Sequence, residues 1–131
     1  MMGSSALQSV TQRDAGEFYD FYTMLYQRYR DAKATDHPAY YGTGNAIATC
    51  QLQEEVIKRV LDKVGYQNLS GAAVGAELDK LTNWNGSMGI IPPVSYTPDD
   101  HRGVTQTKIW KFTGGKFVVA QDWTPAPAIK S

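Results

Sequence analysis

The sequence predicts an α/β chain in which helices come first and an antiparallel β-hairpin follows. Apolar residues recur every three or four positions over residues 18–64, which is typical of amphipathic helices. The period changes to two over residues 104–112 and 116–123, which is typical of strands. Gly114-Gly115 lies between those two segments, and such a pair favours a two-residue hairpin turn. The 131 residues suit one compact unit with no internal repeat.

The first helix is predicted to follow a flexible leader at residues 1–10, where small and polar residues prevail. Asp14 and Glu17 fit a variant of the capping box, and the helix should fade near Lys33. Tyr19 is expected to lie off the apolar stripe, at its margin. The predicted core stripe is Phe18, Phe21, Tyr22, Leu25 and Tyr29.

The second helix is predicted to begin at residues 39–41, because Pro38 disfavours a helical backbone at His37. Gly65 is a natural stop for this helix. Glu54 and Glu55 precede Lys58 and Arg59 by four residues, which indicates an exposed face with ion pairs. The predicted core face is Ile47, Cys50, Val56, Ile57, Val60, Leu61 and Val64.

Ser70 is the predicted N-cap of a third helix, which carries Val74, Leu78 and Leu81 and ends before Asn83. Residues 83–89 form a turn-rich connector, and Pro92-Pro93 favours an extended edge segment. The two strands of the hairpin follow, and residues 124–128 should form an extended, loose tail.

Composition excludes several functional classes. Thirteen basic and thirteen acidic residues give a formal net charge of zero, so the overall charge gives no argument for nucleic acid or an anionic membrane. Cys50 is the single cysteine, which rules out an intrachain disulfide and a cysteine-based metal cluster. Residues 1–7 lack the order of a signal peptide, and no apolar run reaches the roughly 20 residues of a membrane span.

The densest polar cluster is Asp99–Arg102. A hydrolase hypothesis would make His101 a base oriented by an aspartate, but no nucleophile is evident nearby in the sequence. An Asx-type turn, with Gly103 at an unusual φ, is the favoured interpretation. His37 and His101 show no metal-ligand spacing, so the sequence predicts no catalytic residue, no metal and no cofactor.

Tyr40 and Tyr41 stand at the predicted start of the second helix. A helix N-terminus offers free amides and partial positive charge for a carboxylate, and tyrosine adds an aromatic wall with a polar tip. Gly42 and Gly44 would leave space for close approach of a ligand. The alternative interpretation is that both tyrosines simply pack at a lobe surface, and the residues alone do not favour ligand binding over it.

Three stretches of the sequence are informative in their order and spacing. Tyr40–Gly42 leads to Glu55–Val60, Leu69–Gly71 leads to Glu77–Leu81, and the run Gly89–Trp123 follows. Together they resemble type I periplasmic solute-binding proteins, which include the leucine-binding and other branched-chain amino-acid receptors of ABC transporters. The resemblance covers about residues 14–124 and is strongest in these stretches. It implies the C-terminal portion of a two-lobed fold that traps an amino-acid-like solute by cleft closure, binds an ABC permease and catalyses nothing.

By this resemblance residues 11–104 would belong to a first, helical lobe, and residues 105–131 would be a hinge crossing, a second-lobe hairpin strand and a loose tail. Tyr41, Tyr40 and Asn45 would be the ligand-binding residues. The family implies a periplasmic or extracellular location. Two alternatives stay open: a ligand-sensing module of a regulator, or a truncated chain without ligand binding that self-associates through uncovered apolar surface.

Overall fold

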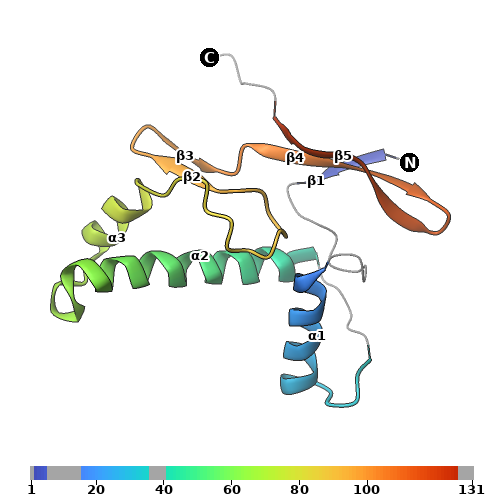
Figure 1. Cartoon of the computed structure of the whole chain (residues 1–131), viewed down its shortest axis with the longest axis horizontal. Coiled ribbons are helices and arrows are strands. Elements are labelled where there is room, and N and C mark those ends of the chain that lie inside the picture. The colour runs from blue at the N-terminus through green and yellow to red at the C-terminus, as the bar shows by residue number, and fades with distance from the viewer. Residues whose placement is uncertain (1, 6–15, 36–40, 127–131) are drawn as a thin grey trace.

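The computed structural model describes residues 2–5, 16–35 and 41–126. Within these residues the chain forms α-helices and antiparallel strands, with the helices mostly preceding the strands (Figure 1). The helical elements are α1 (Glu17–Tyr29), α2 (Tyr41–Val64), the short 3₁₀ helix η2 (Tyr66–Asn68) and α3 (Gly71–Leu78). The strands are β1 (Met2–Ser5), β2 (Ser95–Thr97), β3 (Asp100–Gly103), β4 (Gln106–Thr113) and β5 (Lys116–Pro125).

The long helix α2 is the axis of an extended molecule (Figure 1). Helix α1 crosses near the N-terminal end of α2 and runs away from it, while α3 packs beside the C-terminal half of α2. Two ion pairs lie along α2: an exposed one joins Glu54 to Lys58 at 2.7 Å, and a half-buried one joins Glu55 to Arg59 at 2.8 Å. The four-residue pairing is confirmed, and the exposed face is confirmed for Glu54 and Lys58.

One hydrophobic core lies where the start of α1, the first half of α2 and the segment 81–94 meet. The segment 81–94 bends through Asn83 and Met88, whose φ angles are 50° and 53°, and it places several large side chains over α2. Trp84 and Val94 exchange two backbone hydrogen bonds of 2.9 Å, which closes this segment into a loop. The buried members of the core are Phe18, Ala48, Leu81, Trp84, Ile90, Ile91 and Val94.

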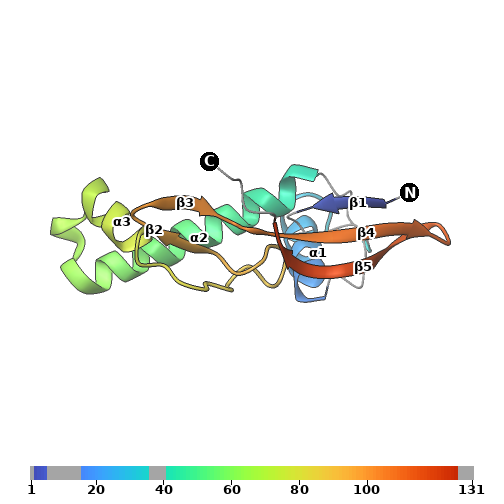
Figure 2. The ribbon, with the colours of Figure 1, turned by 90° about the horizontal axis from the view of Figure 1, so that it is seen from above.

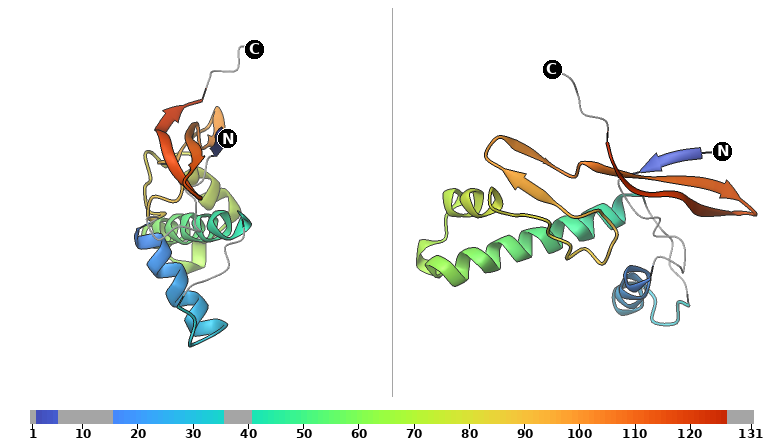
Figure 3. Two further views of the ribbon diagram at one scale, coloured as in Figure 1. Left: turned by 90° about the vertical axis from the view of Figure 1, so that its right-hand side faces the viewer. Right: turned by 45° about the horizontal axis from the view of Figure 1, so that its top comes forward.

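Two antiparallel sheets complete the described part of the chain. Strands β2 and β3 form a small hairpin near α3, and β1, β4 and β5 form a three-stranded sheet in that order. The β4–β5 hairpin, called the arm below, projects past the helices at the end opposite α3 (Figure 2). The views in Figure 3 show the arm separated from α2 along most of its length.

The fold class is confirmed as α/β with helices and antiparallel strands. Helix boundaries agree with the sequence within a few residues, and the turn at Gly114-Gly115 is confirmed by φ angles of 58° and 75°. Strand β4 also lies where the alternation predicts it. The proposed division at residues 104 and 105 stays a prediction.

Some predictions about the helices are wrong. Tyr29 is 68% exposed, because α1 leaves the core after its first turns. Tyr19 is buried instead of marginal. Cys50 is exposed, because it lies about 200° around the helix from the buried Ala48. Ile57 and Val64 are exposed as well, so the true core stripe of α2 runs through Ala48, Val56 and Val60.

Predictions about the strands and the termini also need correction. Residues 2–5, expected to be part of a flexible leader, form β1 and pair with Lys108–Lys111 of β4. The hairpin of β2 and β3 has no counterpart in the prediction, which placed only a turn over Asp99–Arg102. Strand β5 extends to Pro125, into the expected loose tail. Asp14 lies outside the described residues, and Gly16 is the N-cap of α1 without a side-chain hydrogen bond.

Replacing Ser70 by alanine is expected to destabilise the chain by about 1 kcal/mol. Ser70 is the N-cap of α3, and its Oγ accepts a hydrogen bond of 3.2 Å from the amide of Ala73. The measurement is urea unfolding followed by circular dichroism. Ser70→Asp is the control, because aspartate caps as well as serine does and should leave the midpoint nearly unchanged.

Candidate functional site

The arm exposes apolar side chains on one face near its turn. Phe112 and Phe117 stand directly opposite each other in the register, and their rings meet edge to face with centroids 5.1 Å apart. Val119, the register partner of Trp110, lies next along the same face. The exposed fractions of Phe112, Phe117 and Val119 are 46%, 43% and 45%. Such a cluster on a projecting hairpin is a candidate contact surface.

A buried lysine fixes the base of the arm. Lys108 is only 8% exposed, and its Nζ lies 2.9 Å from Oδ1 of Asp122. The same ammonium lies 4.5 Å from the ring centroid of Trp123 and 5.8 Å from that of Trp110, so it makes cation–π contacts with both rings. The hydrogen bond from Lys108 lowers the pKa of Asp122, and the amide of Trp123 adds to that effect.

The register explains this arrangement. Thr107 pairs with Thr124 and Ile109 pairs with Gln121, so Lys108 faces two residues of β5 instead of one. This bulge turns both Asp122 and Trp123 toward the lysine. The sequence alone gave only the alternation of the strands, and the extra residue that creates the bulge leaves no signature in it.

The polar cluster before β4 lies mostly in strand β3, and its hydrogen bonds hold the local structure. Oδ1 of Asp100 accepts hydrogen bonds from the backbone amide of Arg102 at 3.1 Å and from its Nε at 2.9 Å. The bond to the amide of Arg102 is the side-chain contact expected of an Asx-type turn, and Gly103 has the predicted unusual φ, 68°. The predicted location is wrong, because Asp100–Gly103 is strand β3 and the turn itself lies at Pro98 and Asp99. His101 has a partner that the sequence does not reveal, because its Nε2 lies 2.9 Å from Oδ1 of Asp79 at the C-terminus of α3. This contact joins β3 to the helical body.

Acid is expected to weaken the contribution of the Asp100–Arg102 hydrogen bonds to stability. The hydrogen bonds from Arg102 lower the pKa of Asp100 from 3.8 to about 2. A carboxylate with a depressed pKa stabilises the fold fully above its unfolded pKa, and that stabilisation is lost as the pH falls from about 4 to about 2. Urea midpoints at pH 6 and pH 2.5 measure the effect. The drop between these pH values should be smaller in Asp100→Asn than in the unmodified protein, and an equal drop would contradict this role.

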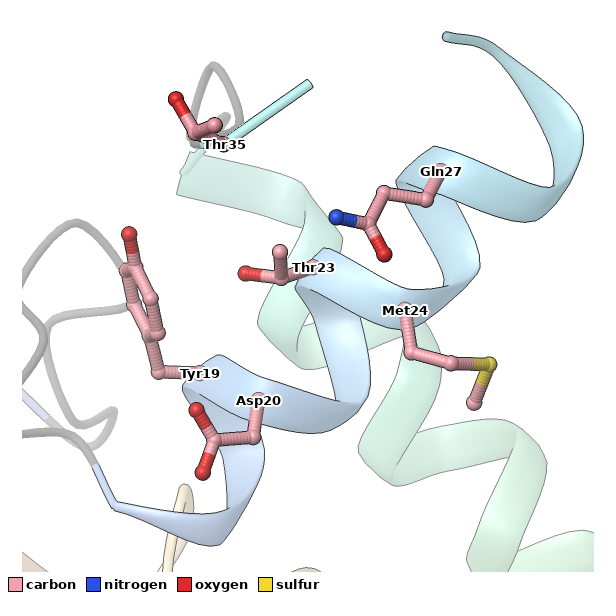
Figure 4. A pocket seen from close by; sticks show the side chains of 6 residues that line it. All are labelled: Tyr19, Asp20, Thr23, Met24, Gln27 and Thr35. Atoms are coloured by element: carbon pink, nitrogen blue, oxygen red, sulfur yellow. The ribbon is translucent and has the colours of Figure 1, made fainter. Parts of the chain in front are cut away.

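A shallow cavity of about 410 Å³ lies along α1. Figure 4 shows its lining, in which all labelled side chains except that of Thr35 come from α1. Oγ1 of Thr23 is buried there and has no hydrogen-bond partner among the described residues. Gln27 already donates from Nε2 to the carbonyl of Ala34 at 2.7 Å. The lining residues are Tyr19, Asp20, Thr23, Met24, Gln27 and Thr35.

The predicted ligand-binding residues are not part of this cavity. Tyr41 is the first residue of α2, as the break at Pro38 predicts, and Tyr40 lies outside the described residues. Asn45 is exposed on the second turn of α2. Their proposed contact with a ligand stays a prediction.

In the ranges 2–5, 16–35 and 41–126, no three side chains of His, Cys, Asp or Glu cluster as a metal site would require. No helix among these residues has the length and apolar character needed to cross a membrane.

Comparison with known proteins gives a match in structure only. No family model matches the sequence, and no curated protein matches it. A crystal structure described as an ABC transporter permease from the Pseudomonas fluorescens group shares the fold, with a TM-score of 0.65 and 16% sequence identity. The match covers 95% of this chain and 31% of that chain, so this chain spans about a third of its neighbour's length.

The identification with periplasmic solute-binding proteins is therefore wrong. The structural neighbour is described as a permease and not as a solute-binding receptor, and no sequence comparison supports a solute-binding role. The neighbour itself is described as part of an ABC transporter, and at 16% identity the likeness shows the fold alone. The periplasmic or extracellular location depended on the receptor family and stays an untested prediction.

Proposed function

We propose that this chain is a non-catalytic structural module of an ABC transporter and that it packs against a larger protein part of that assembly. The observation that carries the proposal is the structural match, in which this fold accounts for 31% of a chain described as an ABC transporter permease. In that neighbour, the remaining two thirds or so of the chain are available for this fold to pack against. This chain would use its open surfaces in the same way.

The outer edge of β5 is the surface best suited to that packing. Within the described residues β5 pairs on one side only, with β4, so its other side is a sheet edge. Edge strands in soluble proteins usually carry charges, prolines or bulges that prevent pairing with other chains. Residues 117–121, Phe-Val-Val-Ala-Gln, have no charge and no proline. This window favours addition of a further strand.

The polar clusters support a structural role in this proposal. Asp100 is engaged by Arg102, His101 by Asp79, and Lys108 by Asp122. Each of these pairs joins elements or fixes a turn, and the histidine contact ties β3 to α3. We therefore propose that these residues hold the geometry of the module and perform no chemistry.

Self-association is a second candidate, because the uncharged window of β5 could also pair with the same window of a second copy. Antiparallel pairing of two β5 edges would join two three-stranded sheets into one. This candidate and the first make different predictions about the identity of the partner.

Photocrosslinking in the native host separates them. A benzophenone amino acid replaces the exposed Ala120 on β5, and the same replacement at the exposed Gln53 on α2 is the matched control. We expect crosslinks from position 120 to a subunit of an ABC transporter, identified by mass spectrometry, and none from position 53. Crosslinks only to a second copy would favour self-association. Equal patterns from both positions would contradict a role for this edge.

A further inference from the structure

The geometry points to a lipid contact at the end of the arm: its tip, residues 111–117, docks on the headgroup region of an anionic bilayer. This inference does not depend on the module packing against a transporter subunit. It concerns the side chains at the turn end of the arm, residues 111–117, whereas the packing surface is the backbone edge of β5 over residues 117–121, and Phe117 belongs to both. Three properties of the tip support it, namely exposed aromatic rings, projection from the body and local positive charge.

The aromatic rings lie where a shallow insertion would need them. Phe112 is the second-last residue of β4 and Phe117 is the second residue of β5, so they flank the tight turn at Gly114-Gly115. Nearly half of each side chain is exposed, and each ring contacts the other edge to face. Paired aromatic rings at the end of a rigid hairpin can enter the interface between headgroups and acyl chains without any helix.

The tip is free of the helical body. In Figure 1 the β4–β5 turn extends beyond α1, and Figure 2 shows the same projection from above. The base of the arm is held by Lys108 and Asp122, so the tip is presented on a fixed support. A flat membrane could therefore approach the tip before it meets α2 or α3.

The charge of the arm differs from that of the whole chain. Residues 104–121 contain Lys108, Lys111 and Lys116 and no carboxylate, although the complete sequence has a net charge of zero. Asp122 neutralises Lys108, which leaves the other two lysines next to the aromatic pair in sequence. Lysines beside an apolar tip are attracted to anionic lipid headgroups. The net charge of zero therefore conceals a locally basic stretch of sequence, whose sign is complementary to such a surface.

The size of the apolar tip favours lipid over a separate protein partner. The two half-exposed phenylalanines offer on the order of 200 Å² of surface. A stable protein interface needs about 800 Å² on each partner. A small insertion reinforced by lysines is typical of reversible binding to membrane surfaces.

Flotation with vesicles tests the inference. The purified 131-residue chain is mixed with unilamellar vesicles of phosphatidylcholine and phosphatidylglycerol, or of phosphatidylcholine alone. We expect flotation with the anionic vesicles and a decrease at high salt. Phe112→Ser/Phe117→Ser should lower the partition coefficient on the order of tenfold or more, and Lys111→Gln by about fivefold. The matched controls are Tyr66→Ser, at an exposed aromatic residue of η2, and Lys33→Gln, at an exposed lysine after α1.

A fluorescent probe keeps the test independent of folding defects in those variants. Thr113→Cys in a Cys50→Ser background places the environment-sensitive NBD dye at the exposed turn, and the native Cys50 labels α2 as the control. Anionic vesicles should shift the emission at position 113 to the blue and leave that at position 50 unchanged. Absence of flotation, or equal shifts at both positions, would overturn the inference. A shift at position 113 caused only by added transporter subunits would assign the tip to a protein partner.

Discussion

Replacing Phe18 by alanine is expected to lower the free energy of unfolding by about 3–5 kcal/mol. Phe18 is fully buried and is the residue of α1 that belongs to the buried core, where it lies with Leu81 and Ile90. Its ring also stacks on Tyr22 with centroids 6.3 Å apart. Since α1 leaves the body after its first turns, few other contacts can compensate. Typical domains are stable by only 5–15 kcal/mol, so much of the total would be lost.

The measurement is urea unfolding followed by circular dichroism, together with hydrogen exchange of the α1 amides. Tyr29→Ala is the matched control, because this aromatic residue of the same helix is 68% exposed and should change stability by no more than about 0.5 kcal/mol. Similar losses for both variants would show that α1 is held along its whole length. A loss below about 1 kcal/mol at Phe18 would show that α1 does not depend on the core.

The helices could be predicted because their signals are local. Three- and four-residue spacing, the N-cap at Ser70 and the stop at Gly65 all act within one or two turns, and the structure places α2 and α3 accordingly. Which face is buried depends on distant residues. Ala48 is small and adds little to an apolar pattern, yet the segment 81–94 packs on its side of α2 and leaves Cys50 exposed.

The strands show the same limit. The turn at Gly114-Gly115 needs positive φ at both residues and is therefore visible in the sequence. Strand β1 depends on pairing with β4, more than 100 residues away, and its own residues, Met-Gly-Ser-Ser, have weak strand propensity. A pairing partner at such a distance cannot be inferred from local spacing, so the β1 strand went unpredicted.

The candidate site was missed for a related reason. Phe112, Phe117 and Val119 read as ordinary strand residues, and their exposure follows from the projection of the arm and not from their spacing. The prediction that Tyr40 and Tyr41 bind a ligand rested on the chemistry of helix N-termini and on a family resemblance that is wrong. The lysines without carboxylates over residues 104–121 were a signal in the sequence, but a net charge of zero concealed it.

Replacing Gly103 by alanine is expected to destabilise the chain by roughly 2–5 kcal/mol, because two costs combine. Gly103 has a φ of 68°, a region that residues with a Cβ rarely adopt. An added Cβ would also lie 2.6 Å from the hydroxyl oxygen and 2.7 Å from Cζ of Tyr96, far inside normal contact distance. Relief requires movement of Tyr96, which packs against the hydrophobic core. The β2–β3 hairpin should therefore loosen together with its contact to α3.

Gly75→Ala is the matched control, because it makes the same chemical change at a helical position. Gly75 lies inside α3, where an added Cβ would meet nothing within 4 Å, and alanine there should stabilise the chain by about 0.5–1 kcal/mol. The two variants should thus shift the urea midpoint in opposite directions. Proton spectra of Tyr96 should change in Gly103→Ala alone. A neutral Gly103→Ala variant with unchanged Tyr96 signals would show that this hairpin does not require the close approach of residue 103 to the tyrosine ring.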